Sequence, residues 1–80
     1  MKLPRDVSGV DLASRLSKLG YRVVRTRGSH IRLTTLENGE HHVAVPLHKP
    51  LRVGMLSAIL SEIANHFDMS VRDLLSRLEL

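Results

Sequence analysis

An alternating hairpin pattern constrains the possible fold more than any other feature of this chain. Polar and apolar residues alternate through His30–Leu36 and again through His42–Pro46, and the segment between them, Glu37-Asn38-Gly39-Glu40, is typical of a turn. A two-residue Asn-Gly loop would place polar residues opposite apolar ones, whereas a three-residue loop with a left-handed Gly39 pairs apolar with apolar. We therefore predict the second register, which pairs Leu33 with Val43 and Ile31 with Val45.

The predicted register divides the hairpin into an apolar face and a polar face. Because side chains alternate across a strand, the residues between the apolar ones share the opposite side of the sheet. That polar side carries His30, Arg32, Thr34, His42 and Ala44.

The remaining elements are predicted from capping signals and apolar spacing. Ser8 with Asp11, and later Ser70 with Asp73, have capping-box spacing, and Gly20 is a typical helix stop. Tyr21–Arg27 favours a short strand, and a Leu/Ile stripe predicts a helix from about Val53 to Phe67.

These elements predict an α+β fold with a three-stranded antiparallel sheet. Their α-β-β-β-α order is like that of a double-stranded-RNA-binding domain, and an additional short helix follows at the C-terminus. The 80 residues form one expected domain, 1–80.

Composition excludes several classes of protein. The chain has no cysteine, which excludes a disulfide framework, and no apolar run of the roughly 20 residues that a membrane span needs. The N-terminal residues lack the apolar core of a secretory signal, so we expect a cytoplasmic protein without a membrane partner. Tyr21 and Phe67 are the only aromatic residues, so the stacking platforms of RNA-recognition motifs are missing.

Positive charge is concentrated in the first part of the chain. Residues 1–52 hold ten Lys/Arg and four Asp/Glu, whereas residues 53–80 hold two and four. Residues 22–35 contain four arginines and no carboxylate, and a Gly28-Ser29 turn there precedes His30. Arginines hold phosphates and a histidine can transfer protons near neutral pH, so this pattern favours chemistry on a phosphodiester. The expected phosphate contacts are Arg25, Arg27, Arg32, Lys49 and Arg52, with Gly28 and Ser29 offering backbone N–H groups or a hydroxyl.

Four short motifs give the chain a family resemblance. Gly20-Tyr21, Arg27-Gly28-Ser29-His30, Val45-Pro46-Leu47-His48 and Gly54 at the head of a Leu/Ile-rich helix together resemble the HicA (YcfA-like) toxin family, over about Ser8–Leu78. The resemblance implies a small ribonuclease that cleaves mRNA, with His30 as the catalytic residue and a HicB-like antitoxin as the protein partner. The sequence departs from the short family pattern at residues 65–69, between the final helices.

Ribonuclease chemistry without a metal needs two proton transfers, and His30 fills one of them. The second role is open: His42 and His48 are candidates, because we expect both to lie near His30, on the neighbouring strand or its exit. A loop residue that caps the backbone between two prolines is the better interpretation of His48, which is also among the expected RNA contacts. His41 is expected to face solvent. A zinc site built from His30, His42 and His48 lacks the usual ligand spacing, so we expect no metal and no small-molecule cofactor.

Two other functions fit the same residues. A non-catalytic RNA-binding module would use the basic face to recognise RNA shape and 2′-hydroxyls. An interaction domain would use that face to dock an acidic protein. Charge and composition alone fit all three functions.

Overall fold

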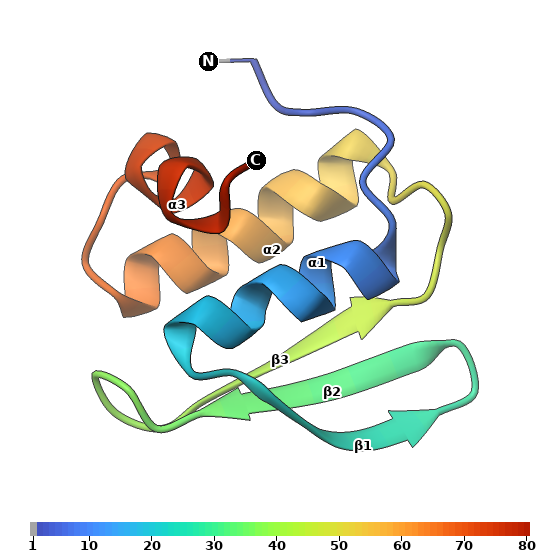
Figure 1. Ribbon diagram of the computed structural model, residues 1–80, viewed down its shortest axis with the longest axis horizontal. Helices are drawn as coiled ribbons and strands as arrows, with labels where there is room; N and C mark the ends of the chain where they lie inside the picture. Colours follow the sequence, from blue (N-terminus) through green and yellow to red (C-terminus); the bar gives the residue numbers. More distant parts are fainter. Residues whose placement is uncertain (1) are drawn as a thin grey trace.

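The computed structural model describes residues 2–80, with three helices on one side of a three-stranded sheet (Figure 1). The elements, in order, are α1 (Gly9–Leu16), the 3-10 turn η1 (Ser17–Leu19), β1 (Arg22–Arg27), β2 (His30–Thr35), β3 (His41–Pro46), α2 (Val53–His66) and α3 (Val71–Leu78). The sheet is antiparallel with the order β1-β2-β3. Helices α1 and α2 pack on β3, and α3 packs on α2. The predicted α+β class and element order are confirmed.

The predicted helix signals have the expected geometry. Ser8 Oγ accepts a hydrogen bond from the backbone N–H of Asp11 at 3.0 Å, and Ser70 Oγ accepts one from Asp73 at 3.1 Å. Gly20 ends the first helical segment with φ 82°, a left-handed conformation that favours glycine. These caps fix where the chain enters β1 and α3.

The hairpin register is confirmed, because Leu33 pairs with Val43 and Ile31 with Val45. The last pair of the ladder is Thr35 with His41, so Leu36 and Glu40, which flank the predicted three-residue loop, do not pair. Both Asn38 (φ 56°) and Gly39 (φ 97°) are left-handed, so the turn uses one more left-handed residue than predicted.

An irregularity in β1 was not predicted from the sequence. Val23 pairs with Leu33, but the next pair is Arg25 with Arg32, which leaves Val24 as an extra residue in a β-bulge. The bulge shifts the alternation, so Arg22 shares a side with the arginines that follow it. We call the side of the sheet turned away from the helices the outer face. It carries Arg22, Arg25, Arg27, His30, Arg32, Thr34, His42 and Ala44.

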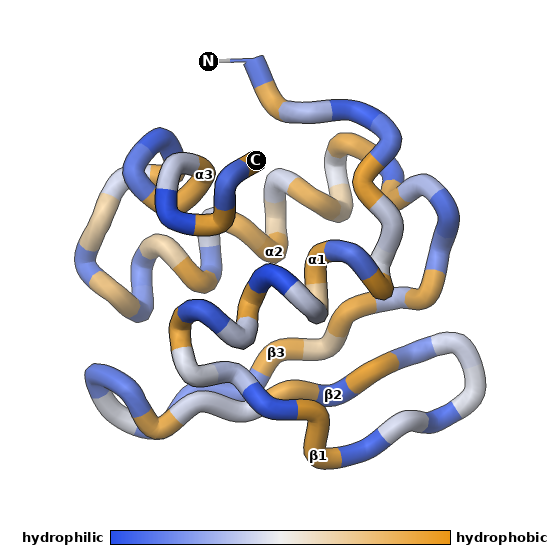
Figure 2. The backbone as a smooth tube through the Cα atoms, viewed as in Figure 1, coloured by the Kyte–Doolittle hydropathy of each residue, from blue (hydrophilic) through white to orange (hydrophobic). Residues whose placement is uncertain are grey.

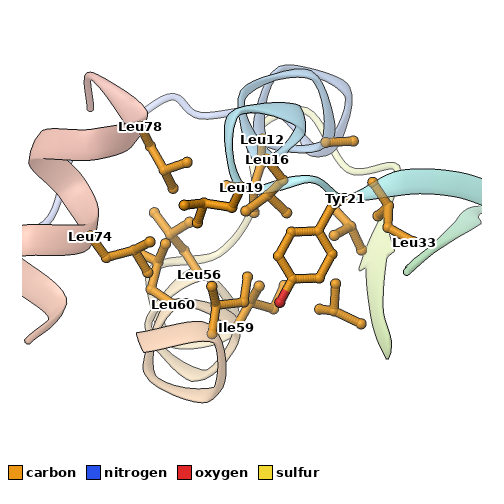
Figure 3. Packing of buried hydrophobic residues seen from close by; sticks show 14 of the residues in the cluster. Leu12, Leu16, Leu19, Tyr21, Leu33, Leu56, Ile59, Leu60, Leu74 and Leu78 are labelled. Carbon is orange, nitrogen blue, oxygen red and sulfur yellow. The ribbon is translucent and has the colours of Figure 1, made fainter. Parts of the chain in front are cut away.

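The core lies between the helices and the opposite side of the sheet (Figure 3). Its fully buried side chains come from α1, β2, β3, α2 and α3, and include Leu12, Leu16, Leu33, Val45, Leu60, Ile63, Leu74 and Leu78. Figure 2 shows hydrophobic segments of β3 beside those of α1, which pack on each other. Among residues 2–80 no helix is long and apolar enough to cross a bilayer.

Helix α3 contacts α1 through hydrogen bonds from Arg15 as well as through apolar side chains. The Arg15 guanidinium donates hydrogen bonds to the carbonyls of Leu78 and Glu79, both at 2.8 Å, and its Nε pairs with Asp11. Lys18 adds an ion pair with Glu79 at 2.9 Å. The last helix is therefore part of the folded core, which leaves the outer face as the exposed side of the sheet.

Candidate functional site

A shallow hollow of about 160 Å³ lies on the outer face, and it is lined by four of the predicted site residues. Arg27 pairs with His30, and Arg25 pairs with Arg32, so the strand ladder places the four side chains in two adjacent rows. Ala44 lies opposite Arg32 on β3, where its small side chain leaves the floor of the hollow open. We call this the His30 hollow.

The arginines of the His30 hollow have no carboxylate partner. Among residues 2–80 four ion pairs form, and none of them includes Arg25, Arg27 or Arg32. Arg25 and Arg32 lie directly opposite each other, and like charges in this position destabilise a sheet. An anion in the hollow would relieve this repulsion, so the arrangement suits a phosphate.

His30 is exposed at the start of β2, directly after a fixed turn. Gly28 has φ 56°, and the carbonyl of Ser29 accepts a hydrogen bond from the N–H of Leu47 at 2.6 Å. Ser29 Oγ lies 3.5 Å from Nδ1 of His30, which is a long contact. The other ring nitrogen, Nε2, forms no hydrogen bond within residues 2–80. Nε2 is therefore accessible to a substrate.

The other predicted contacts lie outside the hollow. His48, Lys49 and Arg52 are exposed in the connection between β3 and α2, and none of them lines the hollow. Because Pro46 pairs with His30, this connection begins beside the hollow. These residues are therefore placed to contact a ligand that extends beyond it.

The prediction that His42 lies near His30 is wrong. His42 pairs with Thr34, four residues along β2 from His30, a separation of about 13 Å at the usual rise of a strand. Its Nδ1 lies 2.7 Å from Thr34 Oγ1, and its Nε2 lies 2.9 Å from Glu40 Oε2. Among residues 2–80 no second histidine lines the His30 hollow.

The prediction that His41 faces solvent is also wrong, because its place in the register turns it toward α2. Its Nδ1 lies 2.7 Å from the hydroxyl of Tyr21, and its Nε2 lies 3.2 Å from Glu62. Its ring stacks on that of His66, with the centroids 4.5 Å apart. Nε2–H of His66 donates to the carbonyl of Glu37 at 3.0 Å. Burial raises the pKa of Tyr21 to about 12.

This partly buried cluster makes stability depend on pH. Burial, and then the neighbouring His66, lower the pKa of His41 below its ordinary value of 6.5. The unfolded chain therefore binds this proton at a higher pH than the folded chain, so folding loses stability as the pH falls below about 6.5. We expect the urea midpoint to be lower at pH 5.5 than at pH 7.5. A His41→Gln variant should show a smaller drop, and an equal drop would exclude His41 as the cause.

Comparison with known proteins identifies the family. Searches of curated proteins and of solved structures found no match. A family model described as the HicA toxin of bacterial toxin-antitoxin matches residues 9–64. The match covers α1, the whole sheet with the His30 hollow and most of α2, and it ends before residues 65–69 and α3. With more than half of its residues matched, the chain belongs to the HicA toxin family.

Proposed function

We propose that this protein is the toxin of a type II toxin–antitoxin pair and that it cleaves mRNA at the His30 hollow. The single observation that supports this most is the convergence of His30 with three arginines that lack carboxylate partners. An exposed imidazole beside unpaired guanidinium groups combines proton transfer with phosphate binding in one place. Membership of the HicA toxin family supports the same chemistry.

The proposed reaction begins with proton removal by Nε2 of His30. This nitrogen takes the proton of a ribose 2′-hydroxyl, and the oxygen attacks the adjacent phosphorus to form a 2′,3′-cyclic phosphate. The bond to the 5′-oxygen breaks, and that oxygen leaves with a proton from solvent or from a second group. Arg25, Arg27 and Arg32 stabilise the charge that builds on the phosphoryl oxygens. The scheme therefore combines acid–base chemistry with electrostatic stabilisation by these arginines.

Contacts beyond the hollow would position the RNA strand. Lys49 and Arg52 offer cations next to the hollow, and His48 offers a ring nitrogen in the same connection. Gly28 and Ser29 offer backbone N–H groups at the turn before His30. The α-β-β-β-α order supports a double-stranded-RNA-binding-like architecture for a single domain, 1–80.

A toxin of this family implies a cognate antitoxin. We propose a HicB-like antitoxin that covers the His30 hollow and supplies the carboxylates that its arginines lack. Charge complementarity of this kind directs association and suppresses wrong partners.

The function is tested with purified protein and RNA in the presence of EDTA. Cleavage in vitro, with growth arrest when the chain is induced in cells, is the expected result. Steeply salt-dependent RNA binding without cleavage would instead establish the non-catalytic module. Affinity for an acidic protein with no RNA binding would establish the interaction domain.

Arg32 provides a separate test of the basic face. Replacing Arg32 with glutamine removes the repulsion with Arg25, so we expect about 0.5 kcal/mol of added stability. The same change removes a phosphate contact and should reduce the salt slope of RNA binding by roughly 0.7–0.9. Urea unfolding and fluorescence anisotropy at several salt concentrations measure the two effects.

Arg72→Gln is the matched control, because Arg72 is exposed on α3, away from the sheet. It should leave both quantities unchanged. Equal salt slopes for the two variants would show that Arg32 does not contact phosphate.

A further inference from the structure

A second hollow, of about 430 Å³, lies next to the His30 hollow on the outer face. Arg22 pairs with Thr34, and Thr34 follows Arg32 by two residues, so both hollows open on the same side of the sheet. Its lining residues are Gly20, Arg22, Thr34, Leu36 and Glu37. The hollow is open to solvent, so a ligand there would lie on the surface of the sheet.

The β-bulge at Val24 brings Arg22 into this second hollow. Alternation without the bulge, counted back from Arg27, would place Val23 rather than Arg22 on the outer face. Bulges recur beside active sites, where they redirect a side chain. Within residues 2–80 Arg22 forms no ion pair, so the row of unpaired arginines continues along β1 from one hollow to the next.

Glu37 contributes a carboxylate to this hollow, next to a turn that is held by backbone and hydroxyl hydrogen bonds. Its N–H donates to Oγ1 of Thr35 at 3.1 Å, and that buried hydroxyl donates to the carbonyl of Leu19 at 2.8 Å. Its carboxylate lies against Gly20, where a Cβ would overlap Oε2 of Glu37. The hollow therefore holds a carboxylate acceptor that forms no ion pair within residues 2–80.

A carboxylate would repel a phosphate bound directly against it, so the Glu37 end of the hollow does not suit a second phosphate. It suits a group that presents two adjacent N–H donors, because an ionised carboxylate has two accepting oxygens. Leu36 is 75 % exposed and offers an apolar surface for a flat ring. A guanine base has this combination of a flat ring and two donors, N1–H and N2–H, on one edge.

We propose that this second hollow binds a guanine base of the RNA substrate. The inference rests on the proposed function, in which the protein cleaves that RNA at the His30 hollow. The guanine edge donates to the Glu37 carboxylate, Leu36 packs on the base, and Arg22 binds the adjoining phosphate. Single-stranded RNA is recognised through such edges. The hollow lies about 13 Å from His30 along β2, so the base lies within a few nucleotides of the cut bond.

Mononucleotide binding tests this subsite independently of cleavage. Titration of ¹⁵N-labelled protein with GMP should shift the amide signals of Gly20, Arg22 and Glu37, whereas AMP, CMP and UMP should bind at least about tenfold more weakly. Glu37→Gln should remove this preference, and Glu40→Gln, which alters a nearby carboxylate bound to His42, should retain it. Equal shifts for all four nucleotides, no shifts at all, or an unchanged preference in Glu37→Gln would overturn the inference.

A cleavage assay separates this inference from the proposed function. In oligoadenylates that carry a single guanine at successive positions, one position should raise kcat/KM about tenfold for the parent protein but not for Glu37→Gln. Cleavage with no dependence on the guanine would refute the subsite alone. If no RNA is cut, the proposed function fails, and the mononucleotide titration still decides the subsite.

Discussion

Replacing His30 with alanine is expected to lower the rate of RNA cleavage by a factor of about 10²–10⁴, the usual contribution of a positioned acid–base group. The affinity for RNA should change little, because the three arginines of the hollow remain. The fold should also be unaffected, since the His30 side chain is exposed. Single-turnover cleavage of an end-labelled RNA measures the rate, and anisotropy measures the affinity.

His42→Ala is the matched control for this experiment. His42 lies on the same outer face, but its hydrogen bonds are to Thr34 and Glu40 and it lies about 13 Å from His30 along the strands. This variant should retain most of the cleavage rate. Similar losses in the two variants would show that the effect comes from the basic face in general and not from His30.

The largest expected effect on stability comes from Gly9, the first residue of α1. Its N–H donates to the carbonyl of His48 at 2.9 Å, and a Cβ at this position would overlap the carbonyl oxygen of Pro46. The colliding atoms belong to the backbone, so no side chain can rotate away. Gly9→Ala must therefore displace α1 from the end of β3, and we expect a loss of about 3 kcal/mol in the free energy of unfolding.

Gly54→Ala is the corresponding control in α2. A Cβ at Gly54 would meet no atom within 4 Å, and the residue lies in a helix. Alanine there should raise the free energy of unfolding by about 0.4–1 kcal/mol, because it restricts the unfolded chain. Urea unfolding measures both variants, and a Gly9→Ala variant as stable as the parent would contradict the described contact between α1 and the end of β3.

The hairpin was predictable because its register depends on residues that are close together in the sequence. Period-two alternation across a turn leaves one register that keeps the apolar residues together, and that register placed His30 and Arg32 on the outer face. The caps at Ser8 and Ser70 were predictable for the same reason, since each depends on a partner three residues away.

Features that depend on contacts distant in the sequence were missed. The bulge at Val24 falls in a segment without clean alternation, so nothing local marks which residue is extra. The partial burial of His41 follows from the packing of α2 over the hairpin, and the carboxylate of Glu37 lies against Gly20, which precedes β1. A sequence pattern does not reveal such contacts.

The residues of the candidate site likewise include some whose positions follow from a local pattern and others whose positions do not. Arg25, Arg27, His30 and Arg32 line one hollow, because strand periodicity places them on one face. His48, Lys49 and Arg52 follow the last strand, where the path of the chain has no period to predict it. Their contact with RNA stays a prediction.

The chemical groups at the ends of the cut RNA show whether cleavage proceeds through attack by the ribose 2′-hydroxyl. An RNA with one defined cleavage site is incubated with the protein in EDTA, beside the same RNA carrying a 2′-deoxyribose at that site. We expect products with a 2′,3′-cyclic phosphate and a 5′-hydroxyl from the first RNA, and no cut at the modified position in the second. Products with 3′-hydroxyl and 5′-phosphate ends, or cleavage of the deoxy substrate, would contradict this mechanism.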